Sequence, residues 1–168
     1  MCSSDLELQP HDLGVSMQAW SAEIEAQAAA RSITFQLEGV ENPGRVAFHA
    51  GTLRRAVLNL LQNALDAMPD GGKLTVCTTA VQHEKPVTGY VQLTVGDTGV
   101  GIPQEIASKV FDLKFTTKSE RNRGEGLGLG LWWVRNFVRR AKGDITIRSE
   151  PGVGTEVYVK IPTGPASG

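Results

Sequence analysis

The stretch that decides the fold is residues 52–68, which read TLRRAVLNLLQNALDAM. Its apolar side chains recur at three- and four-residue steps, which is the period of an α-helix with one buried face. A second edge of this helix carries polar side chains at spacings of four, four and three, namely Arg55, Asn59, Asn63 and Asp66. We therefore expect a helix that has Thr52 as its N-cap and presents this polar edge to a ligand or to solvent.

The segments on both sides of this helix have helical or strand-like patterns. The predicted elements are helices over 11–31, 52–68 and 128–141, and strands over 33–37, 46–49, 73–80, 90–96, 144–149 and 155–161. We expect the strands at 33–37 and 46–49 to pair, because a short turn cluster separates them. The order lacks a regular strand–helix–strand alternation. It predicts an α+β fold, a two-layer α/β sandwich in which helices cover one face of a mixed sheet.

The composition is that of one globular domain. Of the 168 residues, 40% are hydrophobic and 21% are charged, which is enough apolar material for a sizeable core. We expect one domain over residues 13–161, with polar tails at 1–12 and 162–168. The formal net charge of −1 gives no basic excess that would attract nucleic acid. The two cysteines are too few for a disulfide scaffold, and Cys77 is expected to be a buried thiol.

The loop at 97–101 has the chemistry of an adenine pocket. It reads Asp-Thr-Gly-Val-Gly after a predicted strand, and glycines there would let the backbone approach a flat ligand. Because an ionised carboxylate only accepts hydrogen bonds, Asp97 would bind the exocyclic amine of adenine and repel the carbonyl oxygen of guanine. Taken alone, such a motif is more often an ordinary turn.

A second glycine run leads directly into the last predicted helix. Glycine occupies every second position at Gly124, Gly126, Gly128 and Gly130. The absence of side chains there exposes backbone amides and a helix N-terminus to phosphate oxygens. A flexible linker is the structural alternative, but linkers seldom interleave leucines and then enter an amphipathic helix.

The span at 114–126 is too polar to pack and is expected to be a mobile lid that closes on phosphates. Its cations are Lys114, Lys118, Arg121 and Arg123. Each alone is typical of a solvated surface charge. Lys118, which follows Phe115-Thr116-Thr117, is the strongest candidate for a phosphate contact.

The two asparagines of the central helix complete a nucleotide site. An amide oxygen is a hard, neutral ligand suited to Mg²⁺, which takes its other oxygens from water and phosphates. The alternative is that Asn59 and Asn63 simply face solvent. Four motifs at 59–64, 97–101, 124–130 and 152–155 occur together in this order, and they predict a pocket that holds ATP through a metal and backbone amides.

With these motifs, the chain resembles the ATPase superfamily that groups DNA gyrase, ninety-kilodalton heat-shock chaperones, mismatch-repair proteins and sensor histidine kinases. The kinases are the most similar. Their N box resembles 59–64, their first glycine box 97–101, their F box 111–118, and their second and third glycine boxes 124–130 and 152–155. The resemblance covers about residues 13–161 and implies the Bergerat ATP-binding fold with a mobile lid. Residues 58–68 and 115–118 look most like kinases of the nitrogen-regulation type.

The resemblance implies ATP and Mg²⁺ as cofactors and a role for individual residues. Asn63 would coordinate Mg²⁺, Asn59 would support the metal and phosphate site, and Asp97 would read adenine. The expected catalytic residues are Asn59, Asn63 and Lys118. The expected nucleotide-binding residues are Asn59, Asn63, Asp66, Asp97, Gly99, Gly101, Ile102, Thr116, Thr117, Lys118, Gly126, Leu127, Gly128, Leu129, Gly130 and Thr155. Many family members carry lysine or arginine where this chain has Asp66, so that phosphate contact does not carry over and lid cations are candidates to replace it.

The resemblance also implies a reaction. The hydrolytic relatives place a glutamate general base at the position of Asn59. Asparagine there disfavours hydrolysis, whereas a histidine nucleophile needs less help. The acceptor histidine of such kinases lies in a separate helical hairpin, and His11, His49 and His83 all lack that setting. The chain is therefore expected to be a catalytic fragment, a split protein acting on a partner, or a relative without an acceptor.

The predicted function is the ATP-binding catalytic domain of a sensor histidine kinase in two-component signal transduction. Its expected partners are a phosphoacceptor histidine domain, in another chain or a missing segment, and a downstream response-regulator receiver, with no nucleic acid and no membrane insertion. Two alternatives are an anti-sigma-type serine kinase and a nucleotide-controlled binding module without phosphotransfer. Without a membrane span or a signal peptide in the sequence, we expect a cytoplasmic location, either free or as part of a larger membrane-bound sensor.

Overall fold

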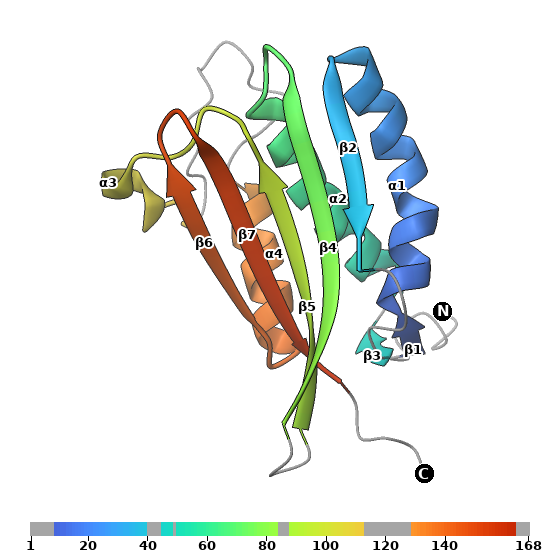
Figure 1. The fold of residues 1–168 in the computed structure, drawn as a ribbon. Helices are drawn as coiled ribbons and strands as arrows, with labels where there is room; N and C mark the ends of the chain where they lie inside the picture. Colours follow the sequence, from blue (N-terminus) through green and yellow to red (C-terminus); the bar gives the residue numbers. More distant parts are fainter. Residues whose placement is uncertain (1–8, 40–44, 49, 84–87, 113–128, 164–168) are drawn as a thin grey trace, which may run out of the picture.

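A computed structural model describes residues 9–39, 45–48, 50–83, 88–112 and 129–163 of the chain (Figure 1). The strands are β1 (Gln9–Asp12), β2 (Ile33–Glu38), β3 (Arg45–Phe48), β4 (Gly72–His83), β5 (Thr88–Asp97), β6 (Asp144–Glu150) and β7 (Gly154–Pro162). The helices are α1 (Leu13–Ala30), α2 (Ala50–Asp66), α3 (Gln104–Ala107) and α4 (Leu129–Arg140).

The strands form a five-stranded sheet with the order β2-β4-β5-β7-β6 and a separate pair made of β1 and β3. In the larger sheet β2 runs parallel to β4, and the other neighbours are antiparallel. Helices α2 and α4 lie behind this sheet in the view of Figure 1, and α1 stands beside β2. The predicted α+β fold, with helices on one face of a mixed sheet, is confirmed.

The core lies between the sheet and the helices. Alternate residues of β5, namely Val91, Leu93 and Val95, are at most 1% exposed, as expected for a strand with one covered face. The apolar stripe of α2 packs in the same cluster through residues such as Leu61 and Leu65, both 0% exposed. Burial of each such side chain stabilises the fold by about 1.5–3 kcal/mol. The stripe thereby fixes the rotation of α2 and turns its polar edge away from the core.

The pairing predicted for residues 33–37 and 46–49 is wrong. Strand β2 instead lies parallel to β4, with Ile33 opposite Gly72, and β3 pairs antiparallel with β1. A parallel pair needs a long crossover connection, and α2 lies in the connection between β2 and β4. Strand β4 therefore pairs with β5 along one edge and with β2 along the other.

Two predicted element boundaries also differ from the structure. Helix α2 begins at Ala50, so Thr52 lies in its first turn and is not its N-cap. Strand β1 and the N-cap of α1 fall in the predicted tail over 1–12, where Asp12 accepts a hydrogen bond from the Val15 backbone nitrogen at 3.1 Å. Residues 9–12 of the predicted tail therefore form a strand and a helix cap, while the domain limits themselves stay a prediction.

The side of the sheet away from the helices is more polar. Cys77 lies on this side, because its neighbours Val76 and Thr78 in β4 are buried against the core. The thiol is half-buried, not fully buried as predicted, and burial together with the charge of Glu38 raises its pKa. Among the described residues, no helix is both long and apolar enough to cross a membrane.

Candidate nucleotide-binding site

Three of the four sequence motifs meet at one end of the sheet. Strand β5 ends at Asp97, β7 begins at Gly154, and the C-terminal end of α2 lies at the same end of the molecule (Figure 1). The strand register places Asp97 opposite Thr155 in β7, and Thr155 opposite Ser149 in β6. Residues that are far apart in the sequence therefore form one continuous wall.

The polar edge of α2 borders this wall. The side chains of Asn59 and Asn63 are both half-buried and stand one helical turn apart. Neither side-chain amide makes a hydrogen bond with another residue in the described part of the chain. Half-buried amides that pair with no other described residue are candidates for contact with a ligand, because leaving them unpaired costs free energy.

Asp66, at the end of the same edge, already has partners within the protein. Its Oδ1 accepts hydrogen bonds from Arg31 Nη1 and Gln62 Nε2, each at 3.1 Å. Arg31 is the C-cap residue of α1, so the ion pair brings a positive charge from another helix to this end of α2. No local sequence pattern indicates Arg31, because only the packing of α1 beside α2 places it there.

The carboxylate of Asp97 is held by backbone donors. The Gly99 nitrogen donates to Asp97 Oδ1 at 2.9 Å, and the Thr155 backbone nitrogen also donates to this carboxylate. Burial raises the pKa of Asp97, and the two backbone hydrogen bonds oppose that shift by favouring the charged form. The side chain is thus a partly buried, oriented hydrogen-bond acceptor.

The loop that follows Asp97 is fixed to α2 and β4. The Val100 nitrogen donates to the Ala67 carbonyl oxygen at 3.0 Å, and Thr98 exchanges two hydrogen bonds with the backbone of Lys73, at 3.0 and 3.2 Å. Since Ala67 lies one turn beyond Asn63, these contacts set the distance between the loop that follows Asp97 and the asparagine edge.

The structure shows a packing role for the glycines of this loop. A Cβ on Gly99 would lie 2.3 Å from the Ala67 carbonyl oxygen, and a Cβ on Gly101, whose φ is +72°, would lie 2.2 Å from the Glu150 carbonyl oxygen. Both glycines are therefore required for close packing between backbone segments of the protein itself. Their contact with a flat ligand stays a prediction.

The third glycine box, residues 152–155, lies where β6 turns into β7 and contacts the loop that follows β5. The Gly152 nitrogen donates to the Val100 carbonyl oxygen at 2.9 Å, and the Ile102 nitrogen donates to Ser149 Oγ at 2.7 Å. Thr155 is only 8% exposed. Sequence reasoning missed Ser149, for which the only signal was a small polar residue at the end of a strand before a glycine turn.

The remaining predicted site residues fall mostly outside the described part of the chain. These are Thr116, Thr117, Lys118, Gly126, Leu127 and Gly128. Leu129 and Gly130 form the start of α4. That helix lies against the asparagine-bearing helix, because Arg55 Cζ stands 4.7 Å from the centre of the Trp133 ring.

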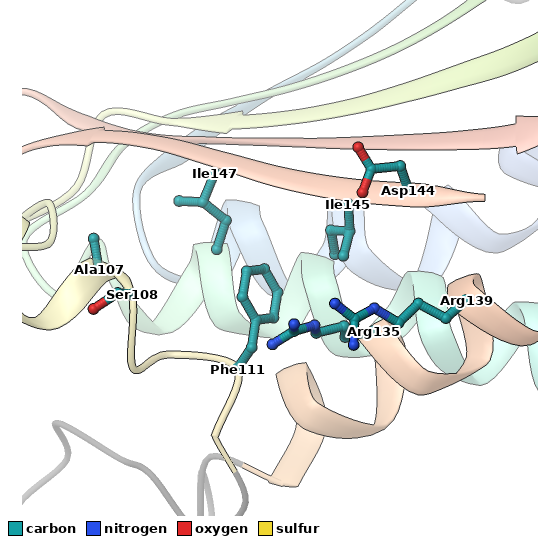
Figure 2. A pocket seen from close by; sticks show the side chains of 8 residues that line it. All are labelled: Ala107, Ser108, Phe111, Arg135, Arg139, Asp144, Ile145 and Ile147. Atoms are coloured by element: carbon teal, nitrogen blue, oxygen red, sulfur yellow. The ribbon is translucent and has the colours of Figure 1, made fainter. Parts of the chain in front are cut away.

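A cavity of about 290 Å³ lies elsewhere, between α3, α4 and β6 (Figure 2). It is lined by Ala107, Ser108, Phe111, Arg135, Arg139, Asp144, Ile145 and Ile147. None of the predicted nucleotide-binding residues lines this cavity.

The described residues also contain no group of three His, Cys, Asp or Glu side chains that could hold a metal. A metal at the asparagine edge would therefore rely on amide oxygens together with oxygens of the nucleotide and water.

Comparison with known proteins gives consistent matches. Residues 49–165 match the family described as histidine kinase-, DNA gyrase B-, and HSP90-like ATPases. The chain is 32% identical to the sensor kinase CckA of Brucella abortus over 82% of its length, and 38% identical to the histidine protein kinase DivJ of Caulobacter vibrioides over 76%. It spans only 15% and 21% of these two proteins. The solved catalytic domain of the histidine kinase ThkA superposes with a TM-score of 0.78 at 25% identity, with 94% of this chain and 96% of that chain covered.

Proposed function

The chain belongs to the family of histidine kinase-, DNA gyrase B- and HSP90-like ATPases, and from this premise we propose that it binds Mg·ATP and transfers the γ-phosphoryl group to a histidine of a separate phosphoacceptor domain. The relatives it matches are named as sensor or histidine kinases, which favours histidine over serine as the acceptor. A receiver domain would take the phosphoryl group in turn. The nitrogen-regulation subtype remains a prediction from residues 58–68 and 115–118.

The observation that carries this proposal is the juxtaposition of the asparagine edge with an oriented carboxylate. The amides of Asn59 and Asn63, which bond to no other residue in the described ranges, stand on α2, and the loop bearing Asp97 is hydrogen-bonded to the same helix at Ala67. A nucleotide with its base at Asp97 would then have its phosphates along the edge of α2. Asp97 would accept a hydrogen bond from the exocyclic amine of adenine, which selects ATP over GTP.

The donor set fits Mg²⁺. Amide oxygens are hard neutral ligands, and Mg²⁺ typically combines one or two protein oxygens with water and substrate phosphates. When bound, Mg²⁺ supplies positive charge that neutralises the phosphate oxygens during transfer. We assign Asn63 as its protein ligand and Asn59 as the residue that supports the phosphates. The lid residues Lys118, Thr116 and Thr117 and the glycines at 126, 128 and 130 would close over these phosphates.

The chemistry expected of this chain is positioning, not activation of water. Asn59 has no group that can take a proton at neutral pH, so it cannot act as the general base that hydrolysis needs. An imidazole nitrogen with a free lone pair is already a nucleophile. In the proposed reaction that nitrogen forms a bond to the γ-phosphorus while the bond to the β–γ bridging oxygen breaks, which yields phosphohistidine and ADP.

The test has two stages. In the first, Mg·ATP and Mg·GTP are titrated calorimetrically into the chain, and binding of ATP but not GTP is expected. In the second, the cognate phosphoacceptor domain is incubated with the chain and γ-labelled Mg·ATP. Acid-labile label on that domain supports the proposal, whereas acid-stable label would select the serine-kinase alternative. A partner that binds with a non-hydrolysable analogue and never becomes labelled would favour the binding-module alternative.

A further inference from the structure

A hydroxyl group outside all of the predicted motifs connects two walls of the candidate adenine site. Ser149 is half-buried in β6 and lies opposite Thr155 of β7. Its Oγ is 2.7 Å from the Ile102 nitrogen, 3.0 Å from the Gly154 carbonyl oxygen and 2.7 Å from Thr155 Oγ1. One side chain thus touches the loop after β5 and the first two residues of β7.

These three contacts use the full hydrogen-bonding capacity of the serine. A hydroxyl has one hydrogen and two acceptor lone pairs. The Ile102 nitrogen donates to Ser149 Oγ, and the Gly154 carbonyl oxygen accepts the serine hydrogen. The Thr155 hydroxyl must then donate its own hydrogen to Ser149. The Ser149 hydroxyl consequently has no donor or acceptor position free for a nucleotide. Thr155 Oγ1 can form a hydrogen bond with a ligand only as an acceptor.

The groups that Ser149 holds are those that position Asp97. Thr155 is the direct neighbour of Asp97 across β5 and β7, and its backbone nitrogen donates to the Asp97 carboxylate. Ile102 follows the loop whose Gly99 nitrogen donates to the same carboxylate. The serine hydroxyl therefore ties together the two segments that supply backbone donors to Asp97.

On the basis of the proposed function, we propose that Ser149 is a positioning residue for adenine recognition. It does not contact the nucleotide, and it holds Thr155 and the 97–102 loop so that Asp97 meets the exocyclic amine of the base. Ser149→Ala would leave three polar groups without their partner: the Ile102 nitrogen, the Gly154 carbonyl oxygen and the Thr155 hydroxyl. Local relaxation of these groups would turn the carboxylate away from the amine.

The test measures preference for the amine, not affinity alone. Mg·ATP and the Mg complex of purine riboside triphosphate, which lacks the exocyclic amine, are titrated into the unmodified chain and into Ser149→Ala. The unmodified chain is expected to prefer ATP, and the substitution to reduce that preference about tenfold, which corresponds to about one hydrogen bond. Thr146→Ala, on the exposed part of the same strand, is the matched control and should keep the preference.

A double substitution separates action through Asp97 from general loosening. If Ser149 acts through Asp97, then Asp97→Asn removes the preference and adding Ser149→Ala to it removes no more, since coupled residues are not additive. Ser149→Cys keeps the side-chain volume with a much weaker hydrogen-bonding group, and it should behave like Ser149→Ala. Equal loss of affinity for both nucleotides, or full preference in Ser149→Cys, would overturn the positioning role.

The outcomes also distinguish this inference from the proposed function. Absence of ATP binding by the unmodified chain overturns the proposed function, and the positioning role with it. ATP binding that is selective and weakened by Asp97→Asn, but keeps its preference in Ser149→Ala, overturns the positioning role alone.

Discussion

The guanidinium carbon of Arg55 lies 4.7 Å from the centre of the Trp133 ring, so a cation–π contact joins α2 to α4. Trp133 in turn stacks on Phe137, with ring centres 5.9 Å apart and planes 8° from parallel. Arg55 stands one helical turn before Asn59, and α4 begins within the second glycine box. The contact therefore connects the asparagine edge with the helix that follows the predicted lid.

Replacement of Arg55 by alanine should remove this connection. We expect a loss of about 0.5–1 kcal/mol in the free energy of unfolding, the usual contribution of an exposed cation–π pair, together with a changed tryptophan emission spectrum. Urea unfolding and fluorescence check both effects. Arg54→Ala is the matched control for the emission spectrum, because Arg54 forms an ion pair with Glu23 of α1 and not a contact with Trp133. Identical emission from Arg55→Ala and the unmodified chain would contradict the prediction.

Asn63→Ala should weaken the binding of Mg·ATP by about tenfold or more, because even outer-shell partners of a bound metal contribute that much. The fold should remain intact, since the side chain lies on the polar edge of α2 and bonds to no other described residue. Calorimetric titration with Mg²⁺, and again with EDTA, measures the effect. In EDTA the two proteins should bind ATP equally weakly. A loss that persists without the metal would remove Asn63 from the role of metal ligand.

Asp97 should make ATP binding depend on pH. Burial raises the pKa of its carboxyl, so the charged acceptor is present above that pKa and is lost as the pH falls through it, at a higher pH than for an ordinary aspartate. Purine riboside triphosphate, which has no amine to donate, should show no such loss. Titrations of both nucleotides across acidic pH measure the difference, and equal pH profiles for the two would contradict it.

The raised pKa of Asp97 also affects the stability of the fold. Whereas a higher pH should favour ATP binding, it should lower the contribution of Asp97 to the free energy of unfolding. A raised pKa in the folded state means that the contribution of Asp97 to stability is present below about pH 3.9 and is lost as the pH rises through the folded-state pKa. The charged carboxylate is thus maintained at a cost to stability at neutral pH. Asp97→Asn should therefore unfold at no lower urea concentration than the unmodified chain at pH 7, even though it binds ATP less well.

Gly99→Ala should destabilise the protein, because the added Cβ would lie 2.3 Å from the Ala67 carbonyl oxygen. Overpacking of this kind costs about 1–3 kcal/mol. Gly96→Ala is the control in the preceding strand, where the nearest atom to an added Cβ is 3.7 Å away. Urea unfolding of both variants measures the contrast. Equal stability of the two would show that the loop is not fixed against α2 as described.

The local patterns of the sequence predicted the elements that depend on near neighbours. The period of residues 52–68 predicted a helix and its buried face, and the alternation at 73–80 and 90–96 predicted the two strands that the structure pairs as β4 and β5. Both features are encoded within a few residues, through the helical repeat and through the two faces of a strand. The motif order at 59–64, 97–101 and 152–155 likewise indicated which residues to seek at one end of the sheet.

Contacts between distant segments were decided only by the tertiary structure. The partner of β2 is β4 and not its sequence neighbour β3, because pairing depends on which sheet edge the chain leaves open. The need for glycine at Gly99 and Gly101 arises from carbonyl oxygens of Ala67 and Glu150, which no local pattern reveals. The same holds for Ser149, whose hydroxyl gains its place only when β6, β7 and the loop after β5 are assembled. A sequence encodes a residue's own conformational preferences, whereas its hydrogen-bond partners depend on how the whole chain packs.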